Sequence, residues 1–268
     1  MSTATGKTDS APKGTVHGGR VFEVVAAFTR LGGDVHSLKD ISEEAGLNEA
    51  TAYRIIQSGL PAEAFEQVDR GRYRLGSGST RIAIEALSHS PDPATMHAVL
   101  DELHQTTGWL AAYYRVMGSK RLCLDYAIGD FDPRRIDLDP AELTSVSRSL
   151  RTGASGRAIL AHLPQSVRDR VLAEPVPEGV GPGVIRDNAQ LVASLEDIRE
   201  RGYAVGRQEC MPGWDSVAVP VCWGDTIQGS ALLLVLADQM PTDPTRFIDA
   251  TVRAATQLSR LVSMSPVT

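Results

Sequence analysis

The sequence predicts an α+β protein in which an N-terminal winged helix-turn-helix precedes a larger α+β domain. Residues 37–60 show two short amphipathic helices that meet at Gly46. After Pro61 the apolar period changes from that of a helix to the alternation of a hairpin. From about residue 94, helix-like and strand-like segments are interspersed, which favours helices packed on a sheet.

The composition fits two folded domains and gives no direct sign of a nucleic-acid partner. The chain has 268 residues, of which 42% are hydrophobic, and its net charge is −6. This length matches two domains of ordinary size. Because the balance is acidic, any contact with DNA has to come from a local basic patch.

The cysteines and the hydropathy favour a cytoplasmic protein without a membrane helix. Three cysteines are far apart in the sequence and form neither a zinc spacing nor a disulfide framework, so we expect a reducing compartment. No apolar run approaches the roughly 18 residues that a membrane helix needs. The N-terminus lacks the apolar segment of a signal peptide.

The first folded element is predicted to begin near Arg20. Residues 1–19 are rich in Ser, Thr, Gly and Lys and predict a disordered tail. Apolar residues then recur at helical spacing as far as Leu31, and the pair Gly32-Gly33 ends that helix.

Residues 37–60 carry the start and stop signals of two successive helices. Ser37, with Asp40 three residues later, predicts a capping box. Gly46 suits the left-handed conformation that ends the first helix, and Asn48 is placed to cap the second. The predicted inner face of the second helix is apolar and consists of Ala52, Ile55, Ile56 and Leu60.

A hairpin completes the first domain. Two short strands are expected at 65–68 and 73–75, around a turn in which Gly71 supplies the positive φ that a tight hairpin often needs. Three helices followed by a hairpin form a winged helix-turn-helix, predicted over residues 20–78. Residues 79–93 are interpreted as a linker helix and a proline-containing boundary.

The second helix of a helix-turn-helix can enter the major groove of DNA. Eight side chains in this helix and the hairpin can bond base edges or phosphates and are the DNA-binding candidates: Asn48, Thr51, Tyr53, Arg54, Gln57, Arg70, Arg72 and Arg74. A solvated helix face, and a charged hairpin edge that prevents sheet pairing, are the alternative interpretations.

The first domain is weakly charged for a DNA-binding domain. Residues 1–90 contain ten Lys and Arg against eleven Asp and Glu, a net charge of −1. We therefore expect modest DNA affinity that depends on a few arginines and on dimerisation.

Residues 94–268 are predicted to form the second domain. Helices are expected at 94–107, 153–163, 191–201 and 244–262. Strands are expected at 109–116, 122–128, 216–222 and 230–237.

Three segments together resemble the IclR family of bacterial transcription regulators, over about the whole chain after residue 20. They are Gly71-Arg-Tyr-Arg-Leu-Gly76, then Arg151-Thr-Gly-Ala-Ser-Gly-Arg-Ala-Ile-Leu160, and finally Ile198 to Val205 with Glu209, Gly213 and Ser216 to Val221. The resemblance implies a winged-helix DNA-binding domain, a linker helix and a GAF-like effector-binding domain. It also implies a homodimer or dimer of dimers that binds an operator in double-stranded DNA under the control of a small-molecule effector.

The resemblance also indicates where an effector binds. The candidates are Ala154, Ser155, Gly206, Arg207, Ser216, Leu232 and Leu234. Free N–H groups where a helix starts suit an anionic or carbonyl ligand, although small residues there also serve close packing on a sheet. The two leucines stand where many family members have serines. They favour an effector more apolar than a simple small acid, with an anionic or carbonyl group near Arg207.

No catalytic, cofactor or metal site is predicted, so we expect no enzyme activity. A nucleophile elbow around Ser155 would need glycine at position 157, where Arg157 stands. His97, Asp101 and His104 share one helical face and are interpreted as a solvated surface rather than a metal site. The alternative function is a GAF-like small-molecule sensor whose winged helix serves mainly in dimerisation.

Overall fold

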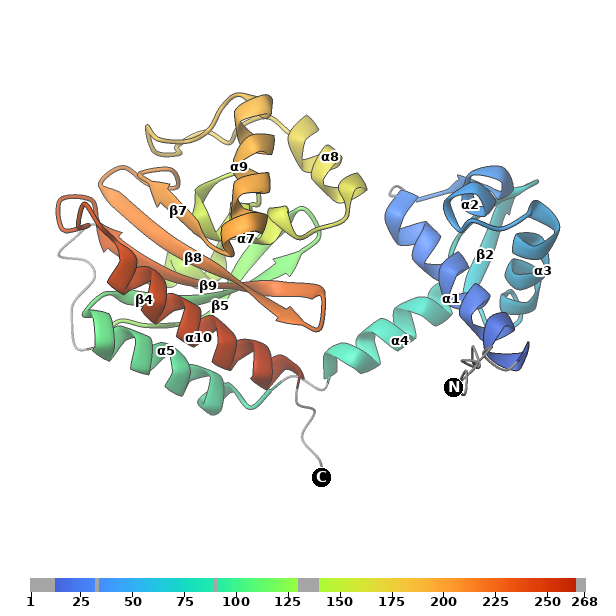
Figure 1. The fold of residues 1–268 in the computed structure, drawn as a ribbon, viewed down its shortest axis with the longest axis horizontal. Helices are drawn as coiled ribbons and strands as arrows, with labels where there is room; N and C mark the ends of the chain where they lie inside the picture. Colours follow the sequence, from blue (N-terminus) through green and yellow to red (C-terminus); the bar gives the residue numbers. More distant parts are fainter. Residues whose placement is uncertain (1–12, 32–33, 89–90, 130–139, 264–268) are drawn as a thin grey trace, which may run out of the picture. The chain divides into compact units, whose positions relative to one another are not determined.

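The computed structural model describes residues 13–31, 34–88, 91–129 and 140–263. It divides into two compact units, residues 1–88 and 89–268 (Figure 1). The predicted α+β fold class is confirmed, because the first unit holds a helix-turn-helix with a hairpin and the second holds an antiparallel sheet with helices on it. None of the described helices is both long enough and apolar enough to cross a membrane.

The first unit consists of four helices and a small sheet. The helices are α1 (Lys13–Leu31), α2 (Leu38–Glu44), α3 (Glu49–Gly59) and α4 (Ser77–Ser88). The strands β1 (His36–Ser37), β2 (Phe65–Asp69) and β3 (Arg72–Leu75) pair in the order β1-β3-β2. Helix α1 includes residues 13–19, which the sequence analysis assigned to the tail, and residues 1–12 of that tail lie outside the described residues.

The predicted signals around the helix-turn-helix are confirmed. The Ser37 hydroxyl accepts from the Asp40 backbone N–H at 3.1 Å, and an Asp40 carboxylate oxygen accepts from the Ser37 N–H at 3.3 Å. These bonds hold the pKa of Asp40 below its usual value. Gly46 has a φ of 63°, and Asn48 accepts from the Thr51 N–H at 2.9 Å. At the start of each helix, the side chain of the N-cap residue therefore accepts a hydrogen bond from a backbone N–H that has no partner within the helix.

An apolar core joins α1, α2 and α3 to the hairpin formed by β2 and β3. The ring of Phe28 on α1 stacks on that of Phe65 on β2, with centroids 5.4 Å apart. Ile41 of α2, Ile56 of α3 and Tyr73 of β3 are buried in the same cluster. One aromatic pair therefore fixes the first helix against the hairpin, and α3 packs on that base through its inner face.

The second unit is built on a six-stranded antiparallel sheet, in the order β6-β5-β4-β9-β8-β7. Its strands are β4 (Leu110–Met117), β5 (Lys120–Ala127), β6 (Arg148–Ser149), β7 (Ala204–Arg207), β8 (Trp214–Trp223) and β9 (Thr226–Leu236). Its helices are α5 (Pro93–Thr107), α6 (Pro140–Ser145), α7 (Gly153–Ala161), α8 (Gln165–Ala173), α9 (Asn188–Arg201) and α10 (Thr245–Ser263).

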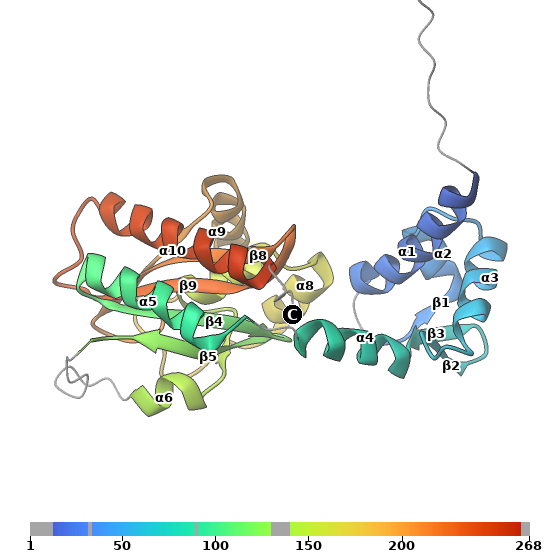
Figure 2. The same cartoon turned by 90° about the horizontal axis from the view of Figure 1, so that it is seen from below.

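Helices cover both faces of this sheet. Figure 1 shows α7 and α9 on one face and α5 and α10 on the other, and Figure 2 shows α5 beside α10. Each face buries its own apolar cluster, one containing Ala154, Leu195 and Leu232, the other containing Leu100, Leu233 and Leu258. Neighbouring residues of β9, such as Leu232 and Leu233, therefore belong to different cores, as the period of a strand requires.

The caps allow a direct test of how the recognition helix is held. Replacing Asn48 with alanine removes the acceptor of the Thr51 N–H, so the free energy of unfolding of the first unit should fall by about 1 kcal/mol. Urea denaturation followed by circular dichroism measures this change. Asn48→Asp keeps an acceptor oxygen and should lose much less, whereas equal losses in both variants would contradict the capping role.

Candidate functional site

Helix α3 presents part of its predicted DNA-binding set to solvent. Tyr53 and Arg54 are exposed, and Gln57 is half-buried on the same helix. The Arg54 Nε donates to the Ala50 carbonyl of its own helix at 3.3 Å, which leaves the terminal nitrogens of the guanidinium available. These three side chains can meet base edges or phosphates together.

Thr51 and Asn48 differ from this expectation. Thr51 was placed on the outward face, but it is only 8% exposed because it lies beside Ala52 and Ile55 where α3 packs on the core. Asn48 is exposed, yet its side-chain oxygen caps α3. Thr51 is therefore a packing residue in the isolated chain. The side-chain oxygen of Asn48 is engaged in the hydrogen bond that caps α3.

The hairpin separates its three arginines into different environments. Arg70 and Arg72 are exposed at the turn, next to a register shift between Gln67 and Asp69 in β2. Arg74 instead faces Glu66 across the two strands, with a guanidinium–carboxylate distance of 2.9 Å. The hydrogen bond that Arg74 donates to the Glu66 carboxylate raises the pKa of Arg74, so this charge is already paired.

Ion pairs engage several positive charges of the first unit, including that of Arg74 in the predicted DNA-binding surface. Arg30, Lys39 and Arg81 pair with Glu44, Glu43 and Glu63 respectively. Among the described residues, Arg54, Arg70 and Arg72 make no ion pair. In the described part of this unit, the exposed guanidiniums without an ion pair are thus those of Arg54 on α3, of Arg70 and Arg72 at the tip of the hairpin, and of Arg20 on α1.

In the second unit, most of the predicted effector residues meet where α7 starts. A Cβ added to Gly206 on β7 would lie 2.7 Å from the Ser216 hydroxyl and 3.1 Å from the Ala154 N. Ser216 pairs in register with both Gly206 and Leu234, and Leu232 lies on the same face of β9. The structure therefore brings together a helix start, a serine hydroxyl and two apolar side chains, all buried.

Arg207 does not belong to this group, which corrects the expectation for it. Gly206 faces α7, so the next residue of β7 points to the opposite side of the sheet. There Arg207 donates to the Asp215 carboxylate at 2.6 Å. Its charge is already neutralised on the other face of the strand.

Two buried arginines near α7, Arg121 and Arg157, were not among the predicted site residues. Arg157, on α7, donates to the Glu209 carboxylate through Nε at 3.0 Å and through Nη2, and the pair is 4% and 5% exposed. Arg121, on β5, is 1% exposed and donates to the Ser155 hydroxyl at 2.8 Å. Arg157 and Glu209 stand in the segments that carry the family resemblance, but the sequence does not show that they pair, and no sequence signal marks Arg121.

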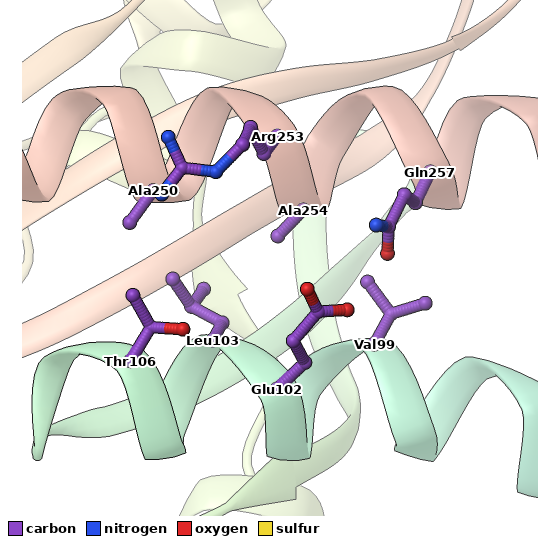
Figure 3. A pocket seen from close by; sticks show the side chains of 8 residues that line it. All are labelled: Val99, Glu102, Leu103, Thr106, Ala250, Arg253, Ala254 and Gln257. Atoms are coloured by element: carbon purple, nitrogen blue, oxygen red, sulfur yellow. The ribbon is translucent and has the colours of Figure 1, made fainter.

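The other face of the sheet offers no comparable site among the described residues. Side chains of α5 and α10, including Glu102 and Arg253, face each other across a shallow hollow of about 10 Å³ (Figure 3). That is the size of a single water molecule. His97 and His104 contact Asp125 and the Trp109 carbonyl, and the described part of the chain contains no metal-ligand cluster.

Two family descriptions match the chain. Residues 19–58 match the IclR helix-turn-helix domain, and residues 146–259 match the bacterial transcriptional regulator IclR C-terminal domain. The chain belongs to the IclR family. It is therefore an IclR-type regulator of transcription, with a helix-turn-helix DNA-binding domain and a C-terminal effector domain.

Known proteins of the IclR family extend this match along most of the chain. SauR of Cupriavidus necator, named as a transcriptional regulator, is 27% identical over 203 residues, which are 75% of this chain and 78% of SauR. The IclR structure of Thermotoga maritima has a TM-score of 0.58 at 21% identity and covers 93% of this chain and 100% of that one.

An IclR homologue of Microbacterium hydrocarbonoxydans, crystallised with 4-hydroxybenzoate, has a TM-score of 0.56 at 20% identity and covers 92% of this chain and 98% of that one. At these identities the two solved structures support the fold alone.

The Arg157–Glu209 pair should be the strongest single polar contact of this IclR effector domain. Glu209→Gln leaves the Arg157 guanidinium buried without its carboxylate and should lower the free energy of unfolding by about 3–5 kcal/mol. Urea denaturation monitored by tryptophan fluorescence measures this loss.

The matched control is Asp197→Asn. Its partner is Arg201, and the two side chains are 54% and 36% exposed, so the loss should stay within about 1 kcal/mol. Similar losses from the buried and the surface pair would show that Glu209 does not hold α7 in place.

Proposed function

We propose that the chain is a homodimeric regulator, not an enzyme, that binds an operator through α3 and the hairpin. On this proposal a small-molecule effector bound at the start of α7 controls DNA binding. The observation that carries the proposal is the placement of Arg54, Arg70 and Arg72. They lie exposed on the helix-turn-helix and its hairpin without an ion pair, whereas Arg30, Arg74 and Arg81 of the same unit are each paired with a carboxylate.

The proposed contact surface consists of Tyr53, Arg54 and Gln57 on α3 with Arg70 and Arg72 at the hairpin tip. Side chains on a recognition helix read base edges, and arginines beside it neutralise phosphates. Arg74 contributes less, since Glu66 already pairs with it. Because this surface is small, two copies reading two half-sites about one helical turn apart supply the specificity that one copy lacks.

Exposed apolar residues in the first unit support the dimer. Phe22 on α1 is 75% exposed, and Ile82 and Ile84 on α4 are 71% and 61% exposed. Side chains of this size are poorly placed in water, and clusters of them mark interaction sites. We propose that α1 and α4 bury these residues against a second copy of the chain, as a dimer or as part of a dimer of dimers.

The proposed effector site is formed by the residues that converge on α7, namely Ala154, Ser155, Gly206, Ser216, Leu232 and Leu234. Two leucines and small side chains favour an effector with an apolar body, and the helix N–H groups favour a polar head. The Microbacterium homologue, whose solved complex contains 4-hydroxybenzoate, has a ligand of that character. The effector can change the DNA affinity only by the difference between its affinities for two arrangements of the two α3 helices in the dimer.

Loss of one free guanidinium on α3 should weaken operator binding. Because Arg54 is proposed to contact a base, Arg54→Ala is expected to reduce the free energy of binding to the preferred operator by about 1–3 kcal/mol. Because Arg72 is proposed to contact a phosphate, Arg72→Ala should weaken binding to all DNA sequences alike. It should also reduce the slope of log K against log salt concentration by about 1. Fluorescence anisotropy with fragments of the chain's own promoter region measures both effects.

Arg81→Ala is the control for this DNA measurement, because Arg81 is paired with Glu63 away from α3. Its affinity should match that of the wild type. If the wild-type dimer bound no fragment, the alternative of a sensor with a dimerising winged helix would replace this proposal.

Charge on the exposed face of α4 should break the dimer. Ile82→Asp combined with Ile84→Asp places two carboxylates where the proposed interface excludes water, so the mass should fall to that of a monomer in sedimentation equilibrium. Val192→Asp, at a 37% exposed position on α9, is the control and should leave the assembly intact. An unchanged assembly in the α4 variant would place the interface elsewhere.

A further inference from the structure

Helix α3 begins with a carboxylate that has no partner. Glu49 is the first residue of this helix and is exposed. Its side chain makes no ion pair and no hydrogen bond with any of the described residues. The cap of α3 does not depend on it, because the Asn48 side chain accepts from the Thr51 N–H at 2.9 Å. The negative charge of Glu49 is therefore available to a partner outside the chain.

Other acidic residues of the first unit are engaged within the protein. Glu43, Glu44, Glu63 and Glu66 each form an ion pair, at distances between 2.6 and 3.9 Å. A carboxylate in the first turn of a helix does interact favourably with the helix dipole. On a surface that faces DNA, however, it repels the phosphates. Glu49 therefore lowers the affinity for DNA unless the DNA offers it a hydrogen-bond donor.

Arg54 brings a guanidinium to the same turn of α3. Its Nε donates to the Ala50 carbonyl at 3.3 Å, so the side chain runs back toward the start of the helix, as helical side chains do. Arg54 and Glu49 make no ion pair with each other. One group that only accepts hydrogen bonds and one that only donates them are thus presented together at the start of α3.

The edges of the DNA bases differ in what they offer to such a pair of groups. The first residues of a recognition helix contact base edges in the major groove. There guanine presents two acceptors, thymine an acceptor and a methyl group, and adenine an acceptor beside its donor, whereas cytosine presents only its N4 amino donor. Phosphate oxygens only accept and cannot bond a carboxylate. Cytosine is therefore the complement of a carboxylate, and guanine is the complement of a guanidinium.

We propose that Glu49 is a specificity-determining residue that accepts a hydrogen bond from the N4 amino group of a cytosine, while Arg54 donates to O6 and N7 of a neighbouring guanine. This inference rests on the operator binding proposed above and assigns a base to a residue outside the predicted DNA-binding set. Glu49 supplies discrimination between bases rather than affinity, because its charge still repels the phosphates. Each half-site of the operator thus contains a cytosine beside a guanine.

The first turn of α3 is fixed well enough for such a contact. Ala52, Ile55 and Ile56 on the inner face of the helix are at most 3% exposed, and the Asn48 cap holds the helix start. On binding, only the side chains of Glu49 and Arg54 have to be ordered. A helix start held in this way keeps the two groups in register with particular base pairs, and little ordering of the backbone opposes binding.

The test begins by selecting a binding site with the full-length protein. Duplexes with a randomised centre are enriched on the wild type, and fluorescence anisotropy then gives the Kd for the selected site and for each of its single-base-pair variants. At one cytosine of the half-site, replacement by any other base should weaken wild-type binding about 10-fold or more. Replacement of the neighbouring guanine should have an effect of similar size.

Two substitutions of Glu49 show which base pair it contacts. Glu49→Gln keeps the size of the side chain but replaces the carboxylate with an amide, which pairs with N6 and N7 of adenine. The preferred base at that position should change from cytosine to adenine, with the other positions unchanged. Glu49→Ala should bind all four bases there with similar Kd values, and its affinity for unselected DNA should rise because a negative charge has gone.

Glu43→Gln is the matched control, since it removes a carboxylate of the same unit from α2, where Glu43 lies 3.9 Å from Lys39. It should change the affinity for all sequences alike and keep the base preference. A Glu49 that acts only on the helix dipole would lower the Tm in Glu49→Gln and leave the base preference as in the wild type. An unchanged preference in both Glu49 variants would therefore overturn the assignment.

The same selection separates this inference from the proposed function. If the wild type enriches a defined site and both Glu49 variants keep the same preference, the cytosine contact fails and the regulator proposal stands. If the wild type enriches no sequence, the regulator proposal fails, and the cytosine contact fails with it.

Discussion

The close approach of α7 to the sheet is the constraint on which the effector unit depends. An added Cβ at Gly206 on β7 would lie 3.1 Å from the Ala154 N of α7, and one at Gly156 of α7 would lie 2.7 Å from the Nη1 of Arg121 on β5. Glycine allows this approach, and the buried Arg157–Glu209 pair ties α7 to the loop after β7. The same closeness leaves the Arg121 guanidinium against the first turn of the helix. A change in the position of that turn would therefore also displace the strands and the β7–β8 loop that contact it.

The charge of the first unit explains why such a change can control DNA binding. Arg30, Lys39, Arg74 and Arg81 of the first unit are already paired with acids, and the proposed DNA contact rests on three unpaired arginines, Arg54, Arg70 and Arg72. The electrostatic part of the affinity for DNA grows with the number of phosphates that the protein neutralises. A single DNA-binding domain with few unpaired cations therefore binds DNA weakly. Weak half-sites make the complex sensitive to the spacing of two recognition helices, and a modest difference in effector affinity between two arrangements is then enough to shift the equilibrium.

The sequence predicted local features well because short-range chemistry determines them. Ser37, Gly46 and Asn48 act within one turn of the chain, and their roles were readable from spacing alone. Helix α8 and strand β7 were missed, because α8 buries a single residue and β7 is a short strand interrupted by glycine. Thr51 and Arg207 were misplaced for a related reason. Which way a side chain faces depends on packing partners that are distant in sequence, and the burial of Arg121 beside the first turn of α7 depends on the fold in the same way.

The most direct test of the whole account is the reciprocal effect of the effector on DNA binding. The Kd for the promoter fragment is measured by fluorescence anisotropy with and without a saturating concentration of a small molecule that raises the Tm of the protein. The account predicts a change of the Kd of about 5-fold or more, in either direction. An unchanged Kd, with the small molecule bound, would contradict the claim that the α7 site controls the helix-turn-helix.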